Sequence, residues 1–253
     1  MPDLSRSELD RLGDRLRAAV EPDDADRLAY EEYRESFGPA LSAVINRATA
    51  VLSEVLDHAA RFKTLESTVA KLRRGSARLS QIQDIAGLRI VIPTTPEQDE
   101  AIAALSAAFP NARITDYRDE PQHGYRAVHI ITQRTLGHGV EIQVRTRFQN
   151  MWASVSERAA FDAGMDVKYG GGPAPVRESL DSLSRLLASM DEATTTFRQM
   201  GTPPTRNRGR ADRASFIREM RKALVEFRAN TEAMEREVDE LMRILEAMNG
   251  SPR

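Results

Sequence analysis

The spacing of apolar positions changes along the chain and divides it into three parts. Near the start, apolar residues recur every three or four positions, which predicts a helix over residues 5–20. Pro22 and the two aspartates after it interrupt the pattern and can cap a following helix. A second helical tract is expected over residues 25–58, bent near Gly38 and Pro39.

The middle of the chain changes period and alternates short strands with helices. Strands are expected over residues 88–92, 112–117, 126–132 and 140–145, and helices over residues 96–109 and 147–163. This order predicts a mixed α/β (α+β) core.

Helical spacing returns towards the C-terminus, over residues 176–200 and 214–248. Glycine- and proline-containing linkers are expected at residues 169–175 and 201–210, the second of them basic. The apolar stripe of the last helix can pack on the body or on a partner helix, and the period alone does not decide between them. We therefore divide the chain into N-terminal helices packing on the core (1–58), the core (59–168) and a C-terminal helical region (176–250).

Composition narrows the classes of function. The chain has 253 residues, of which 41% are hydrophobic and 29% charged, with a formal net charge of −2. The balance excludes a global basic field for nucleic acid, so any phosphate binding must come from local clusters. Cysteine is absent, which excludes disulfides, thiolate zinc sites and cysteine nucleophiles. With no apolar signal core and no transmembrane stretch, a soluble cytoplasmic protein without membrane contact is expected.

The segment 140–145 alternates apolar and polar residues, as a half-buried strand does. One face carries Val140, Ile142 and Val144, and the other carries Glu141, Gln143 and Arg145. A carboxylate, an amide and a guanidinium on one rigid edge suit a site for a metal ion and a polyphosphate. The plain alternative is an ordinary surface strand with a solvated polar face.

A basic cluster precedes the first core strand. If residues 61–63 are extended, Arg61 and Lys63 share a face, and if a helix begins near Thr64, Ser67 and Lys71 stack one turn apart. Several cations could then bind one polyphosphate. The alternative is a solvated basic helix.

An acid stands just before a strand in Asp84-Ile-Ala-Gly-Leu-Arg89. A carboxylate there, with a glycine that allows close backbone approach, suits a magnesium ligand. The alternative is an aspartate turn followed by a core strand.

A loop marked by Pro121 and Gly124 leads into the strand that carries His129. Tyr125 at this loop–strand edge could stack on a purine, or it could be a core tyrosine beside a satisfied core histidine. Apolar packing is expected for Trp152, the one tryptophan of the sequence.

Taken in order, these motifs resemble the synthetase domain of the RelA/SpoT family, which makes guanosine tetra- and pentaphosphate. The resemblance covers about residues 59–165 and is most specific at Asp84–Arg89, at Gly124-Tyr125 with His129, and at Glu141–Thr146. It implies a nucleotidyltransferase-like mixed sheet flanked by helices. The N-terminal helices lack the histidine and aspartate array of a manganese-dependent hydrolase domain, so the chain resembles a small stand-alone member.

The resemblance also implies an activity. The family transfers the β,γ-pyrophosphate of ATP to the ribose 3′-hydroxyl of GDP or GTP, with Mg²⁺, and releases AMP. By position, Asp84 and Glu141 match the metal-binding and catalytic acids. The expected ATP-binding residues are Arg61, Lys63, Ser67, Lys71 and Arg89, and the expected acceptor-binding residues are Tyr125, His129, Gln143 and Arg145.

One motif departs from the family. The loop usually reads Pro-Lys-x-Asn-Gly-Tyr, whereas here Pro121-Gln-His-Gly-Tyr125 is one residue shorter and lacks the lysine and the asparagine. The acceptor therefore stays open between a guanine nucleotide, another nucleotide and the 3′ end of tRNA. A non-catalytic nucleotide sensor is a further alternative. Small family members often self-assemble through C-terminal helices, so residues 214–248 are the candidate homo-oligomerisation or regulatory element.

Overall fold

The computed structural model describes residues 4–163, 170–201 and 210–250. Its elements form two compact units. Among these residues, the first unit contains 4–90, 101–115 and 129–144, and the second contains 91–100, 116–128 and the described residues from 145 to 250. The mixed α+β class and the sheet flanked by helices are confirmed. The division into domains at residues 58 and 168 stays a prediction.

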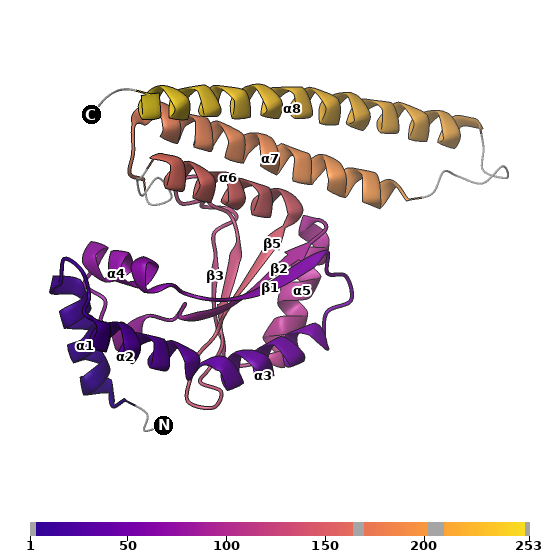
Figure 1. Cartoon of the computed structure of the whole chain (residues 1–253). Helices are drawn as coiled ribbons and strands as arrows, with labels where there is room; N and C mark the ends of the chain where they lie inside the picture. The colour runs from indigo at the N-terminus through magenta and orange to yellow at the C-terminus, as the bar shows by residue number, and fades with distance from the viewer. Residues whose placement is uncertain (1–3, 164–169, 202–209, 251–253) are drawn as a thin grey trace. The chain divides into compact units, whose positions relative to one another are not determined.

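The sheet has five strands in the order β1-β2-β5-β4-β3 (Figure 1). These strands are β1 (Asp57–Phe62), β2 (Ala86–Ile92), β3 (Arg113–Asp116), β4 (Val128–Ile131) and β5 (Glu141–Thr146). The expected core strands are confirmed, and β1 is an addition to them. The helix α5 (Thr95–Ala108) follows β2, as its spacing predicted.

The N-terminal helices of the first unit are α1 (Arg6–Ala18), α2 (Asp24–Glu35) and α3 (Gly38–Thr49). Ser5 and Glu8 form a capping box that starts α1, and Asp23 caps α2. Helices α1 and α2 pack against α4 (Leu65–Arg74), and α1 also contacts the short 3₁₀ helix η1 (Leu79–Gln81). Buried leucines, among them Leu12, Leu16 and Leu72, form the core of this part.

The expectation of one bent helix over residues 25–58 is wrong. The chain forms two helices, because Pro39 stands in the first turn of α3, where its missing N–H is tolerated and its fixed φ favours a helix start. Helix α3 ends at Thr49, and the strand β1 begins at Asp57.

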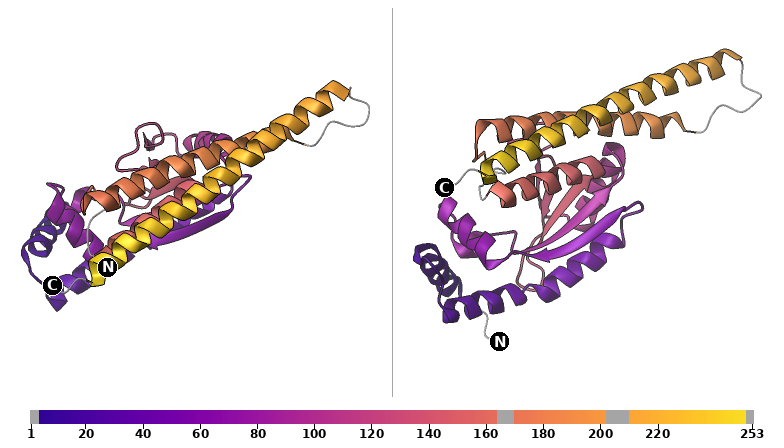
Figure 2. Two further views of the ribbon diagram at one scale, coloured as in Figure 1. Left: turned by 90° about the horizontal axis from the view of Figure 1, so that it is seen from above. Right: turned by 45° about the horizontal axis from the view of Figure 1, so that its top comes forward.

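The second unit contains α6 (Arg147–Ala163), α7 (Ala174–Met200) and α8 (Arg210–Gly250). Helices α7 and α8 run antiparallel and side by side, and α6 packs on both (Figures 1 and 2). Their shared core includes Trp152, Leu180, Leu187 and Leu241. Trp152 therefore packs as expected. Tyr169 of the first expected linker and residues 202–209 of the second lie outside the described residues.

No helix in the described segments is both long enough and apolar enough to cross a membrane. The cytoplasmic localisation stays a prediction.

Candidate active site

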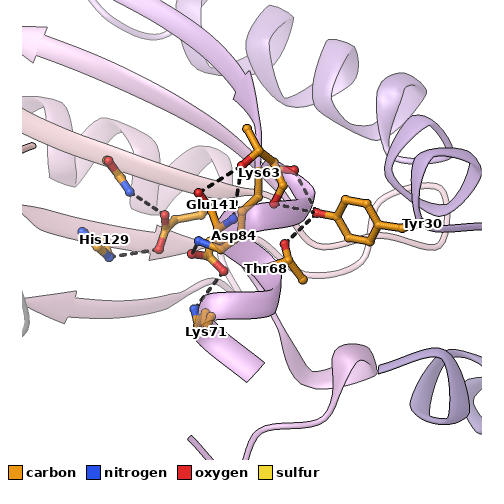
Figure 3. A network of polar contacts seen from close by, with 10 residues as sticks. Tyr30, Lys63, Thr68, Lys71, Asp84, His129 and Glu141 are labelled. Carbon is orange, nitrogen blue, oxygen red and sulfur yellow. Dashed lines mark hydrogen bonds and ion pairs between the residues drawn. The ribbon is translucent and has the colours of Figure 1, made fainter. Parts of the chain in front are cut away.

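Asp84 lies between two lysines in the first unit (Figure 3). Its Oδ2 is 2.9 Å from the Nζ of Lys63, and its Oδ1 is 2.8 Å from the Nζ of Lys71. Lys63 follows β1, Lys71 lies on α4, and Asp84 precedes β2. Thr64 caps α4 by accepting a hydrogen bond from the Ser67 amide, so the helix begins where the sequence predicted. Two residues of the basic cluster, Lys63 and Lys71, therefore form ion pairs with an acid.

The two lysines determine the charge state of Asp84. Burial raises the pKa of this carboxyl, but the ammonium groups of Lys63 and Lys71 outweigh burial and lower the pKa to about 2. Asp84 is therefore ionised at neutral pH. An aspartate turn alone would not require these two cations, so the arrangement favours a site over a simple turn.

Glu141 begins β5 and is held on both carboxylate oxygens. The Nδ1 of His129 on β4 lies 3.0 Å from Oε1, and the Nε2 of Gln143 donates to Oε2 at 2.6 Å. Burial raises the pKa of Glu141, whereas the hydrogen bonds from His129 and Gln143 lower it, and the net shift is downward. Glu141 is thus a buried, ionised and oriented carboxylate (Figure 3).

The sequence predicted a half-buried strand over residues 140–145, or as an alternative an ordinary surface strand with a solvated polar face. Neither degree of exposure is found in β5. All six residues of the strand are buried. The reason is its place in the sheet, between β2 and β4, where both edges of the strand are paired. A polar residue at such a position needs a partner, and Glu141 finds its partners in His129 and Gln143.

Three further residues are expected to bind ATP, namely Arg61, Ser67 and Arg89. Arg61 is an exposed residue of β1, and Ser67 is exposed on the first turn of α4. The guanidinium of Arg89 on β2 is half-buried, and its Nη2 lies 3.9 Å from an oxygen of Asp57. The structure therefore brings Lys63 and Lys71 to Asp84, while it places Arg89 beside β1.

Tyr125 and Arg145 form a pair in the second unit. The Nη2 of Arg145 donates to the hydroxyl of Tyr125 at 3.0 Å, and the guanidinium carbon lies 5.3 Å from the ring centroid. Tyr125 is only 8% exposed and packs on Tyr117 and Trp152, with ring centroids 6.0 and 6.1 Å away. In the structure this ring is therefore a packed residue, and stacking on a base requires it to become accessible.

Tyr30 is a residue of this network that the sequence did not single out. Its hydroxyl donates to the carbonyl of Lys63 at 2.8 Å and lies 2.7 Å from the Oγ1 of Thr68. The tyrosine has one proton, so the threonine hydroxyl is the donor of the second bond. Burial raises the pKa of Tyr30 to about 12. Tyr30 looks like any core residue of an amphipathic helix, and no local motif marks its contact with Lys63.

The chain is similar to known proteins both in sequence and in structure. Residues 60–165 match the family described as the region found in RelA / SpoT proteins. An uncharacterized protein of Mycobacterium tuberculosis is 32% identical over 202 residues, which cover 76% of this chain and 73% of that protein. The GTP pyrophosphokinase YjbM of Bacillus subtilis is 30% identical over 153 residues, which cover 54% and 69% of the two chains.

Among solved structures, the small alarmone synthetase 1 from Bacillus subtilis has a TM-score of 0.56 and 25% identity. That match covers 68% of this chain and 96% of the solved chain. The sequence identity over more than two thirds of the relatives' length decides the family: this chain belongs to the RelA/SpoT family.

Proposed function

We propose that the chain transfers the β,γ-pyrophosphate of ATP to the ribose 3′-hydroxyl of GDP or GTP and releases AMP. The observation that carries the proposal is the ionised Asp84 held by Lys63 and Lys71, in the same unit as the buried, oriented Glu141. The names of the relatives, a GTP pyrophosphokinase and a small alarmone synthetase, support the same reaction.

The two carboxylates suit Mg²⁺ by their donor chemistry. The charge of Asp84 raises the pKa of Glu141, so the two carboxylates interact electrostatically. Among the described residues, no group of three or more histidines, cysteines and acids could hold a metal ion. Mg²⁺ commonly binds through one or two carboxylates and substrate phosphates rather than through an all-protein cage. Asp84 and Glu141 would hold the ion, which would neutralise charge on the phosphates of the donor.

The lysines would bind the donor. When a polyphosphate enters, Lys63 and Lys71 can turn from Asp84 towards its oxygens, because an ammonium on a flexible stem can share its three protons among several acceptors. These cations would stabilise the charge that develops as the pyrophosphoryl group is transferred.

The lowered pKa of Glu141 favours one of its two expected roles. A general base works best with a pKa near the operating pH, and Glu141 is shifted in the other direction. Glu141 is therefore better suited to hold the metal and orient the 3′-hydroxyl than to remove its proton.

The transfer of pyrophosphate to tRNA has less support. In the sequence, the basic linker Arg206–Arg210 supports this reaction. Residues 206–209 of that linker lie outside the described residues.

The test is release of AMP by purified protein with ATP, Mg²⁺ and either GDP or GTP, and omission of the acceptor is the control. The Asp84→Asn and Glu141→Gln variants should lose the activity while keeping the melting temperature near that of the wild type. The absence of AMP with every guanine nucleotide would contradict the proposal. A labelled tRNA product would favour the tRNA reaction. If the protein has an effect on cells, and that effect is the same in the Asp84→Asn and Glu141→Gln variants, the result would favour the non-catalytic sensor.

A further inference from the structure

The turn that carries Tyr125 has an unusual backbone. His123 and Gly124 both have positive φ, 51° and 84°, and the amide of Tyr125 donates to the carbonyl of Gln122 at 3.0 Å. Two successive positive φ values at the centre of a four-residue turn are typical of a type I′ turn, which favours asparagine followed by glycine. Histidine tolerates positive φ better than most residues. The turn conformation therefore forms without the asparagine of the family loop.

Helix α7 contacts this turn through Ser184. The Oγ of Ser184, which is 3% exposed, donates to the carbonyl of Gly124 at 2.6 Å. The Nε of Arg126 donates to the same Oγ at 3.3 Å, and the Nη1 of Arg126 donates to the carbonyl of Arg118. The hydroxyl of Ser184 thus uses its donor and an acceptor position, and it links Gly124 of the turn, and Arg126 just after the turn, to α7.

The turn is also enclosed by α6. A Cβ placed on Gly124 would lie 2.9 Å from the Cζ2 of Trp152 and 3.2 Å from the Cβ of Ser184. The indole Nε1 of Trp152 donates to the carbonyl of Leu180, one helical turn before Ser184, at 2.8 Å. Gly124 therefore lies where α6 and α7 meet, with no space for a side chain.

We propose that Ser184 is a positioning residue that fixes the Gln122–Tyr125 turn and thereby sets the affinity for the acceptor nucleotide. This inference rests on the proposed function, in which Tyr125 belongs to the acceptor site. The loop is one residue shorter than the family loop and lacks its lysine and asparagine. A hydroxyl from α7 supplies a hydrogen bond to the loop backbone. This bond would hold the backbone of the turn in place while the packed Tyr125 side chain turns out to meet a base.

The test compares Ser184→Ala with Ser189→Ala. Ser189 is an exposed serine of the same helix whose hydroxyl bonds the carbonyl of Arg185. Ser184→Ala should raise the KM for GDP about fivefold, the factor expected for one lost hydrogen bond, and leave the KM for ATP unchanged. Ser189→Ala should change neither. Ser184→Thr keeps the hydroxyl that bonds the carbonyl of Gly124. This variant should restore the KM for GDP.

A second measurement keeps the inference separate from the proposed function. Hydrogen exchange of the Tyr125 amide should be faster in Ser184→Ala than in the wild type and in Ser189→Ala, whether or not the protein turns over.

If the wild type releases AMP but both the KM for GDP and this exchange are unchanged in Ser184→Ala, the inference is overturned and the function stands. If the wild type releases no AMP, the function fails, and unchanged exchange overturns the inference as well. Faster exchange supports the positioning of the turn. An equal rise in the KM values for ATP and GDP would indicate general damage and would also overturn the inference.

Discussion

At the scale of single residues, buried acids of this protein differ in the partners that surround them. Asp84 has two ammonium groups, which lower its pKa to about 2. Asp191 on α7 accepts a hydrogen bond from the Oγ1 of Thr146 at 2.6 Å, yet burial dominates and raises its pKa to about 7. Its other oxygen, Oδ1, is buried with no hydrogen-bond partner among the described residues. Burial alone therefore does not determine the charge of an acid in this fold.

The raised pKa of Asp191 predicts a pH-dependent stability. The folded protein binds this proton more tightly than the unfolded chain does, so the stability from this group is present below the ordinary pKa of 3.8 and is lost as the pH rises to about 7. An asparagine can still accept the bond from Thr146 but carries no charge. Asp191→Asn should therefore melt at a higher temperature than the wild type at about pH 8, with the gap closing towards about pH 4.

The exposed Asp181 on the same helix provides the matched control. Asp181→Asn removes a charge at the surface and should leave the melting temperature close to that of the wild type. A lower melting temperature of Asp191→Asn at both pH values would contradict the assignment of a destabilising buried charge.

Tyr30 predicts a separate effect on the donor side. Tyr30→Phe removes the partner of the Lys63 carbonyl and of the Thr68 hydroxyl but keeps the buried ring. We expect a loss of about 1 kcal/mol in the free energy of unfolding and a KM for ATP raised about threefold, because Lys63 is less firmly held. The KM for GDP should stay unchanged. Tyr33→Phe, one turn further along α2, is the control, and an equal effect of both variants would contradict the positioning of Lys63 by Tyr30.

At the scale of elements, α8 has two kinds of apolar residue. Ala223, Leu241 and Leu245 are buried, as expected for a helix packed on its own chain. Ile217 and Leu224 are 54% and 55% exposed and lie seven residues apart, which places them on one side of the helix. The sequence pattern left open whether α8 packs on the body or on a partner, and the structure shows packing on α7 and α6 along part of its length. Homo-oligomerisation stays a prediction.

The exposed positions allow a direct test of that prediction. If α8 joins copies of the chain, the double variant Ile217→Glu, Leu224→Glu should reduce the mass measured by light scattering, because charges would replace apolar contacts. Glu235→Gln, at an exposed position of the same helix, should leave the mass unchanged. A double variant with the mass of the wild type would contradict an interface at these residues.

At the scale of the whole molecule, local features of the sequence predicted most of the elements. The sequence singled out Asp84, Lys63 and Lys71 and predicted the start of α4 and the strand β2, but it did not predict that the two lysines contact the acid. The full burial of β5 depends on its neighbours in the sheet, which its own alternation does not specify. The contacts of Tyr30 with Lys63 and of Ser184 with Gly124 join residues far apart in sequence, and periodicity has no signal for them.

The transfer of the β,γ-pyrophosphate of ATP to a ribose 3′-hydroxyl can be followed with the label of γ-labelled ATP. With GDP and Mg²⁺, we expect one labelled guanosine product for each AMP released, and no such product from 3′-deoxy-GDP. Asp84→Asn should give no product with either acceptor. Release of ADP instead of AMP, or equal labelling of 3′-deoxy-GDP, would show that the pyrophosphate is not transferred to the 3′-hydroxyl.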